Sequence, residues 1–476
     1  METSIIDRFN KWLQESVTVK LVSIGFLVLL LLIPSTWIQH LMHERQSRAE
    51  DVIDEISSKW SGKQSLSGPV LVIPYHYRET VIDRNKEGVE YVERKANYYF
   101  LPEKLDVKGT VKPQVLHRGI FDAAVYESQI EMRAEFAKPV IDAEGVSQKD
   151  VLWNEARMVF SVSDLRGISD NPSFLVGNAN MATEPTGDIG LDIPVNKWED
   201  SESGRDSGSG GGSVYLSNGI VARLGWTSEK DFNGHAEITL PLKGSQQLAF
   251  IPSGKTTEVK LSGPWASPSF NGEFLPAERE ISAEGFSARW KVLHYNRPFA
   301  QSWNTDHLKL AGADFGVKLL IPVDQYQKSI RTSKYSELII ILTFAALFLV
   351  EISRKIRIHP FQYILIGAAL IIYYTLLISL SEQVGYNAAY WVSTLATVGL
   401  VGAYSLSFME ERRLTTLLIS VMLVFYAFIF VIILQQDFSL LLGSIGLFII
   451  VGAMMYFSRT VKWYDEAREP HVKIGS

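Results

Sequence analysis

Cysteine is absent from this chain of 476 residues. Disulfide bonds and zinc sites built on thiolates are therefore excluded, and any extracytoplasmic domain must be stabilised by its own hydrophobic core. An excess of basic residues is also missing, because 46 Lys and Arg stand against 52 Asp and Glu. We consequently expect no nucleic acid among the partners.

Sequence motifs of common enzyme classes are missing as well. The chain has no G-x-S-x-G nucleophile elbow, no G-x-x-x-x-G-K-[ST] phosphate loop, no G-x-G-x-x-G turn and no H-E-x-x-H zinc motif. We therefore expect no catalytic residues, no cofactor and no metal ion, and we interpret the protein as a non-enzyme.

Long apolar runs are present, and they define a membrane protein. A helix needs about 20 apolar residues to cross a bilayer core of about 30 Å. One run lies near the N-terminus and five lie in a C-terminal region, 335–457, which predicts a five-helix bundle. The six predicted spans are 21–38, 338–350, 361–380, 384–408, 414–434 and 438–457.

Polar and small residues of these spans do not favour a secondary transporter. Glu351 and Glu382 fall at predicted span ends, whereas proton-coupled transporters commonly carry ionisable groups within the membrane. Gly399 and Ala403, four residues apart, predict a helix-packing face.

Basic residues indicate the orientation. Lys and Arg occur in the tail 1–20, in the loops near 354–357 and 412–413, and in the tail 458–476, whereas the loops 381–387 and 435–437 have neither. The positive-inside rule then predicts cytoplasmic N- and C-termini in a bacterial inner membrane, with residues 63–334 in the periplasm. An uncleaved transmembrane helix, 21–40, continues into a helical connector, 41–62, whose Val52, Ile53, Ile56 and Trp60 have helical spacing.

The periplasmic region has the period of β-strands. Three rows of alternating apolar residues predict a large, mainly antiparallel β domain of the sandwich type. The rows are Ile130/Met132/Ala134/Phe136, Ala236/Ile238/Leu240/Leu242 and Phe315/Val317/Leu319/Ile321. The segment 196–213 is rich in Gly and Ser, and we expect a flexible loop there.

Short words recur in the same order within this region and suggest two related modules, 66–195 and 214–331. The alternative is coincidence among short words. The repeated words are Leu66-Ser67-Gly68-Pro69 with Leu261-Ser262-Gly263-Pro264, Phe100-Leu101-Pro102 with Phe274-Leu275-Pro276, and Val115-Leu116-His117 with Val292-Leu293-His294.

Several longer motifs resemble the CreD family of inner-membrane proteins associated with cell-envelope integrity and envelope stress. The resemblance covers nearly the whole chain and implies a location and a process, but no assigned activity or catalytic residue. The motifs are Leu66-Ser67-Gly68-Pro69-Val70, His117-Arg118-Gly119-Ile120-Phe121, Asp164-Leu165-Arg166-Gly167-Ile168, Pro268-Ser269-Phe270-Asn271-Gly272-Glu273-Phe274-Leu275-Pro276, Pro322-Val323-Asp324-Gln325-Tyr326-Gln327-Lys328 and Arg357-Ile358-His359-Pro360.

Four residues are candidate contacts for a ligand or partner. Asp164 and Arg166 stand two apart at a predicted strand end, where the guanidinium could bind an anion or close a turn through an internal ion pair. His117 and His294 occupy equivalent places in the repeated words, where either structural or acid–base roles are open.

Three hypotheses on function follow. The first is a non-catalytic protein whose β domain binds an envelope component or envelope protein while the helices anchor it among membrane lipids. The alternative is lipid handling through an apolar groove leading to the bundle. The third, an envelope hydrolase, would need clustered carboxylates or a Ser/His pair in a cleft. The sequence leaves the ligand and the oligomeric state open.

Overall fold

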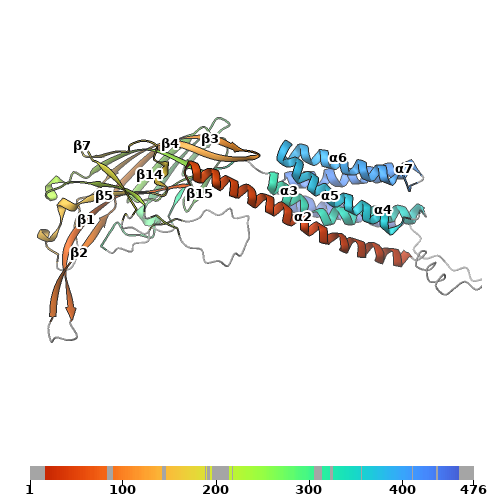
Figure 1. Ribbon diagram of the computed structural model, residues 1–476, viewed down its shortest axis with the longest axis horizontal. Coiled ribbons are helices and arrows are strands. Elements are labelled where there is room, and N and C mark those ends of the chain that lie inside the picture. The colour runs from red at the N-terminus through yellow and green to blue at the C-terminus, as the bar shows by residue number, and fades with distance from the viewer. Residues whose placement is uncertain are drawn as a thin grey trace, which may run out of the picture. The chain divides into compact units, whose positions relative to one another are not determined.

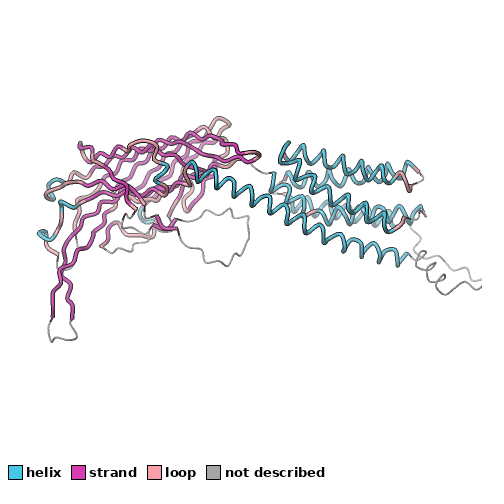
Figure 2. The backbone as a smooth tube through the Cα atoms, in the orientation of Figure 1, coloured by secondary structure: helices cyan, strands magenta, loops and turns pink. Residues whose placement is uncertain are grey.

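The computed structural model describes residues 17–82, 89–141, 146–187, 189, 193–195, 214–216, 218–304, 313–321, 325–354, 356, 358–409, 411–435 and 438–459. The chain forms two compact units. The helical unit comprises Met1–Glu50 and Val323–Ser476, and the β unit comprises Asp51–Pro322. Figure 2 shows that helices make up the first and strands the second. The predicted loop 196–213 lies outside the described residues.

Six long helices stand where the six spans are predicted. Four of them, α2, α4, α5 and α7, are long and apolar enough to cross a membrane. α6 carries more polar side chains, and α8 has a shorter apolar run, Leu441–Tyr456, so the count of six stays a prediction. The described helices are α2 (Val17–Trp60), α3 (Gln325–Ser333), α4 (Ser336–Arg354), α5 (Pro360–Val384), α6 (Tyr386–Ser405), α7 (Arg412–Leu434) and α8 (Ser439–Ser458).

Packing between these helices depends on glycines other than those predicted. A Cβ on Gly367 would lie 2.2 Å from a methyl carbon of Leu31, so α5 approaches α2 closely there. A Cβ on Gly402 would lie 2.6 Å from Ile419. The prediction for Gly399 and Ala403 is wrong, because no atom of the described residues lies within 4 Å of such a Cβ on Gly399 and Ala403 is exposed. The helix-packing glycine of α6 is on the adjacent face.

Most strands of the β unit belong to two mainly antiparallel sheets, as Figure 1 shows. The nine-stranded sheet has the order β15 (Pro268–Gly272), β19 (Phe315–Leu319), β13 (Gln247–Phe250), β1 (Gln64–Ile82), β5 (Arg157–Val162), β11 (Gly219–Arg223) and β8 (Thr183–Thr186), with β2 (Val89–Phe100) between β1 and β18 (Ser302–Trp303). The eight-stranded sheet has the order β16 (Glu278–Ile281), β17 (Phe286–Leu293), β14 (Thr256–Gly263), β3 (Lys104–Arg118), β4 (Phe121–Glu135), β12 (His235–Ser245), β6 (Ser173–Val176) and β7 (Ala179–Asn180). A separate ribbon pairs β9 (Ile193–Val195) with β10 (Val214–Leu216).

Side chains of both sheets fill one shared core. Tyr126 and Trp290 from the eight-stranded sheet and Phe160 and Phe315 from the nine-stranded sheet are at most 1% exposed. The three predicted apolar rows lie on β4, β12 and β19 and at their ends, and all their members are buried except the partly buried Ile321. Because alternate residues of a strand point to one face, these rows identify the strand faces that meet in the core.

Strands of the two predicted modules interleave in both sheets. In the eight-stranded sheet, β3 and β4 of the first module lie between β14 and β12 of the second. The tetrad beginning at Leu66 lies in β1 of one sheet, whereas the tetrad beginning at Leu261 spans the end of β14 in the other. The modules are therefore not two separate sandwiches, and duplication stays a hypothesis. Figure 1 shows the paired tips of β1 and β2 projecting from their sheet.

Candidate functional site

Asp164 and Arg166 form a clamp on the last turns of α2. Asp164 follows β5, and its carboxylate accepts hydrogen bonds from Arg166 Nε at 2.9 Å, Arg166 Nη2 at 2.8 Å and the Gly62 backbone N–H at 2.9 Å. The remaining guanidinium nitrogen, Nη1, donates to the Ser58 carbonyl of α2 at 2.9 Å. That contact caps a free carbonyl near the helix C-terminus, where a positive charge is also favoured.

The electrostatics of this clamp are those of a structural ion pair. Burial raises the pKa of Asp164, but hydrogen bonds from Arg166 and Gly62 outweigh that effect and lower the pKa to about 2. The side chain of Asp164 is 15% exposed. Arg166 donates its Nε and both terminal nitrogens within the protein, so the internal ion pair of the turn interpretation is present, and a role of the guanidinium in binding an anion stays a prediction.

Neighbouring polar groups extend the clamp across three segments of the chain. The amide nitrogen of Gln64 donates to Ser61 Oγ at 2.9 Å, to the Asp164 carbonyl at 2.9 Å and to the Lys243 carbonyl at 3.1 Å. A Cβ on Gly167 would lie 2.3 Å from that amide nitrogen, so only glycine fits beside it. No local sequence pattern indicated Gln64, because its partners lie up to 179 positions away.

The rest of the α2 terminus also packs on the β unit. The ammonium group of Lys243 lies 4.7 Å from the centre of the Trp60 ring, and Trp60 Nε1 donates to the Tyr126 carbonyl at 3.5 Å. Glu55 pairs at 2.5 Å with Arg118, the last residue of β3. The apolar positions predicted along the connector, Val52 to Trp60, are partly buried.

The two histidines do not share a site. Nδ1 of His117 lies 2.6 Å from an Asp122 carboxylate oxygen across the β3–β4 hairpin, and its side chain is 70% exposed. His294 follows β17 and packs its ring on Tyr295, with ring centres 3.8 Å apart. Strand pairing shows how far apart they lie. Leu293, directly before His294, pairs with Thr256, and Thr256 in turn pairs with Lys104, so His294 is near the start of β3. His117 is 13 residues further along β3, or roughly 40 Å away.

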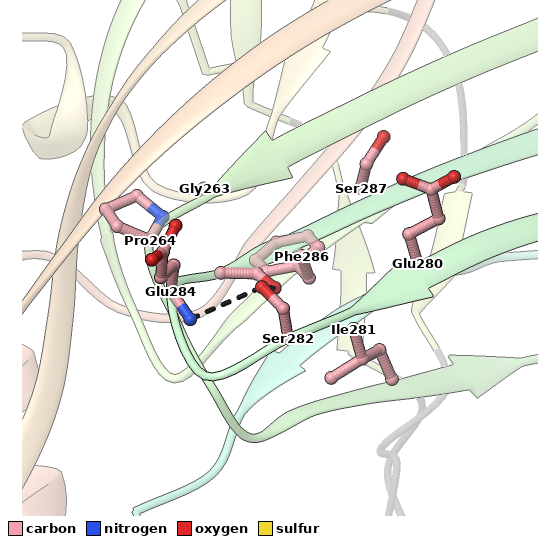
Figure 3. A pocket seen from close by; sticks show the side chains of 9 residues that line it. Gly263, Pro264, Glu280, Ile281, Ser282, Glu284, Phe286 and Ser287 are labelled. Atoms are coloured by element: carbon pink, nitrogen blue, oxygen red, sulfur yellow. Dashed lines mark hydrogen bonds between the residues drawn. The ribbon is translucent and has the colours of Figure 1, made fainter.

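A shallow pocket lies where the β16–β17 hairpin meets the end of β14 (Figure 3). Its volume is about 390 Å³, and its lining includes Glu280, Glu284 and the 51%-exposed Ile281. The Glu284 backbone N–H donates to Ser282 Oγ at 3.3 Å, which shapes the turn at its rim. The pocket contains none of the four predicted contact residues.

The helical unit contains a buried ion pair that the sequence did not reveal. Lys20 Nζ of α2 donates to a Glu351 carboxylate oxygen of α4 at 2.7 Å, and Glu351 is 3% exposed. The Tyr363 hydroxyl of α5 donates to the second carboxylate oxygen at 2.9 Å. Glu351 does lie near the end of its helix, as predicted, but its partners come from two other helices.

Tyrosines line the interior between α5, α6 and α7. The ring centre of Tyr373 lies 4.9 Å from that of Tyr374, 4.8 Å from that of Tyr426 and 6.0 Å from that of Tyr390. All four residues are at most 1% exposed, and Tyr390 donates to the Tyr426 carbonyl at 2.6 Å. The sequence signal that could have found this cluster is the number of tyrosines within the apolar spans. None of these four tyrosines was among the candidate contacts predicted from the sequence.

Comparison with known proteins points to one family. The family profile described as "Inner membrane protein CreD" matches residues 16–464. The chain is also similar to the Inner membrane protein CreD of Escherichia coli (strain K12), with 31% identity over 451 residues, which covers 94% of this chain and 93% of that protein. The family predicted from the motifs is therefore confirmed.

Proposed function

Because the chain belongs to the CreD family of inner membrane proteins, we propose that it supports cell-envelope integrity without catalysing a reaction. In this proposal the β unit lies in the periplasm and binds an envelope component or a partner protein. The helices hold it in the inner membrane as six spans, with both termini in the cytoplasm.

The filled interior of the sandwich carries this proposal. Side chains such as Trp290, Phe315 and Phe160 occupy the space between the sheets, so recognition falls to the surface of the β unit. The same filling argues against lipid handling through an apolar groove between the sheets. Asp164 and Arg166, two of the predicted contacts, are engaged in holding α2.

Charge placement in the helical unit supports the proposed orientation. The bond from Lys20 to Glu351 brings the beginning of α2 beside the end of α4, where Arg354 follows. Basic residues of two segments far apart in the sequence therefore gather at one end of the unit. That end is the cytoplasmic one under the positive-inside rule.

A complementation experiment tests whether the β unit works together with the helices. A flexible Gly/Ser segment of about 15 residues is inserted after Ile321, ahead of α3, in a strain that lacks the family member. Insertion further along, after Lys328, would interrupt α3, which has five buried residues. Protein abundance and survival under envelope stress are measured together.

We expect the insertion variant to accumulate normally and to protect poorly. The matched control carries the same segment appended after Ser476 and should protect fully. Full protection by both proteins would show that the β unit acts independently of its short connection to the bundle. Mass spectrometry of lipids and proteins that stay bound in mild detergent then identifies the component, and a reproducible absence of any partner would contradict the binding role.

A further inference from the structure

Eight hydroxyl groups inside the helical unit are buried without a hydrogen-bond partner among the described residues. Ser329 lies on the short helix α3 and Ser405 at the last residue of α6, away from the other six. We call the other six the hydroxyl belt. They belong to Thr343 of α4, Tyr373 and Tyr374 of α5, Ser393 and Thr394 of α6 and Tyr426 of α7, and each residue is at most 1% exposed. The belt includes three members of the tyrosine cluster.

Contacts at one end of the bundle align the helices that carry the belt. Thr332 of α3 lies 2.6 Å, hydroxyl to hydroxyl, from Tyr386, the first residue of α6. Gly385 alone separates that residue from the end of α5. Arg331 of α3 donates to the Gln435 carbonyl, directly after α7, at 3.2 Å. The ends of α5 and α7 and the beginning of α6 therefore meet at α3, and α4 begins shortly after α3.

Counting from these ends places the belt at one depth. Thr343 is seven residues from the start of α4, Ser393 and Thr394 are seven and eight from the start of α6, Tyr426 is eight from the end of α7, and Tyr374 and Tyr373 are ten and eleven from the end of α5. At 1.5 Å per residue these positions lie roughly 10–17 Å from the α3 end. Residues with unpaired hydroxyls on four helices therefore lie at a similar depth along the bundle.

Other hydroxyls of these helices donate hydrogen bonds to backbone carbonyls of their own helix. Thr375 donates to the Ile372 carbonyl at 2.8 Å and Thr416 to the Arg412 carbonyl at 2.9 Å, each within its own helix. A Ser or Thr in a membrane helix ordinarily does this, because lipid offers no partner. The belt hydroxyls do not, and a buried group left unpaired loses its whole hydration energy. Unpaired hydroxyls at one depth on neighbouring helices are the groups that a hydrogen-bonding guest between those helices would contact.

The chemistry of that partner follows from the side chains. The belt contains hydroxyls and aromatic rings but no charged group, and the carboxylates of Glu351 and Glu382 are hydrogen bonded to Tyr363 and Tyr326 instead. An ion would lack a counter-charge at this depth. We propose that the hydroxyl belt is a binding site for neutral oxygen groups, either ordered water or the glycerol hydroxyls of a lipid headgroup.

Removing single hydroxyls from the full-length protein in mild detergent tests the site. Tyr374→Phe, Tyr426→Phe and Thr394→Val keep the side-chain shape and delete one hydroxyl each. If a guest is bound, each variant should unfold at a temperature several degrees lower than the parent protein. The matched control, Tyr404→Phe, alters a partly exposed tyrosine of α6 and should change nothing. Unchanged or raised unfolding temperatures in all three variants would overturn the proposal, because deleting an empty, unpaired hydroxyl does not destabilise.

Two further measurements distinguish the sources of the oxygen groups. Native mass spectrometry of the parent protein should detect a retained lipid that the Tyr374→Phe variant loses, if the guest is a lipid. Millisecond hydroxyl-radical labelling should modify Tyr374 despite its burial, if the guest is water. Lower stability with neither a retained lipid nor labelling would also overturn the proposal, since the hydroxyls would then act only within the protein.

Discussion

Replacing Asp164 by Asn should weaken the β unit measurably at neutral pH. The substitution keeps the shape of the side chain but removes the charge that Arg166 and the Gly62 N–H share. It also leaves Arg166, which holds the Ser58 carbonyl, without its ion-pair partner. We therefore expect α2 to detach from the sandwich more easily.

The lowered pKa of Asp164 sets the magnitude. A carboxyl whose pKa falls from 3.8 to about 2 on folding contributes about 2 kcal/mol, present above the unfolded pKa and lost as the pH falls through the folded pKa. For a unit of this size, that corresponds to a decrease of about 4–8 °C in the midpoint of thermal unfolding. Near pH 3 roughly half of the contribution remains, because the carboxyl titrates in the unfolded chain before it does in the folded protein.

Thermal unfolding of the full-length protein in detergent, followed by tryptophan fluorescence, measures this difference. The control is Asp106→Asn, which breaks a surface pair with Lys104 whose side chains are 35% and 47% exposed. Exposed pairs contribute about 0–1 kcal/mol, so the control should change the midpoint little. Equal midpoints for Asp164→Asn and the parent protein at pH 7 would refute the structural role of the clamp, as would a difference that does not shrink toward pH 3.

Three further predictions concern the helical unit and its orientation. Glu351→Ala should lower the yield of folded protein, because deleting one partner of a buried ion pair costs about 3–5 kcal/mol. If the double variant, in which Lys20 is also replaced by Met, regains the yield, the unpaired charge of Lys20 caused the loss. Gly367→Leu should destabilise the helices by overlap with a neighbouring helix, whereas Gly399→Leu should be tolerated, because no atom of the residues that the structure describes lies near its Cβ. Thermal stability in detergent compares the two variants, and equal losses would contradict this packing. A reporter that is active only in the cytoplasm should work after Ser476 and fail within residues 201–212, and the reverse pattern would invert the orientation.

Local patterns predicted the strands because the alternation of apolar and polar residues shows which face of a strand is buried. The rows on β4, β12 and β19 needed no knowledge of their neighbours, since a strand presents every second side chain to the core. The order of the strands within each sheet could not be predicted in this way. β1 pairs with β13 in parallel and with β2 and β5 in antiparallel fashion, and no local pattern distinguishes among these partners.

In the clamp, too, the contact between residues close in the sequence could be predicted, whereas the contacts between distant residues could not. Asp164 and Arg166 are two residues apart, so an internal ion pair was among the sequence alternatives. Their contacts with Ser58 and Gly62 span about a hundred residues and depend on where α2 ends. Whether the pair binds a ligand or holds a helix is thus decided by which distant carbonyl lies within reach of the guanidinium.

Composition and contiguous residues were enough to predict the family, the apolar spans, the strand faces and the absence of disulfides. Long-range packing was needed to show that Glu351 is buried against Lys20, that Gly367 rather than Gly399 is a packing glycine, and that unpaired hydroxyls of four helices lie at a similar depth. Helical periodicity shows that a helix has faces but not which face meets a neighbour. In an apolar span both faces are hydrophobic, so the polarity contrast that identifies a buried face in water is missing and packing alone makes the choice.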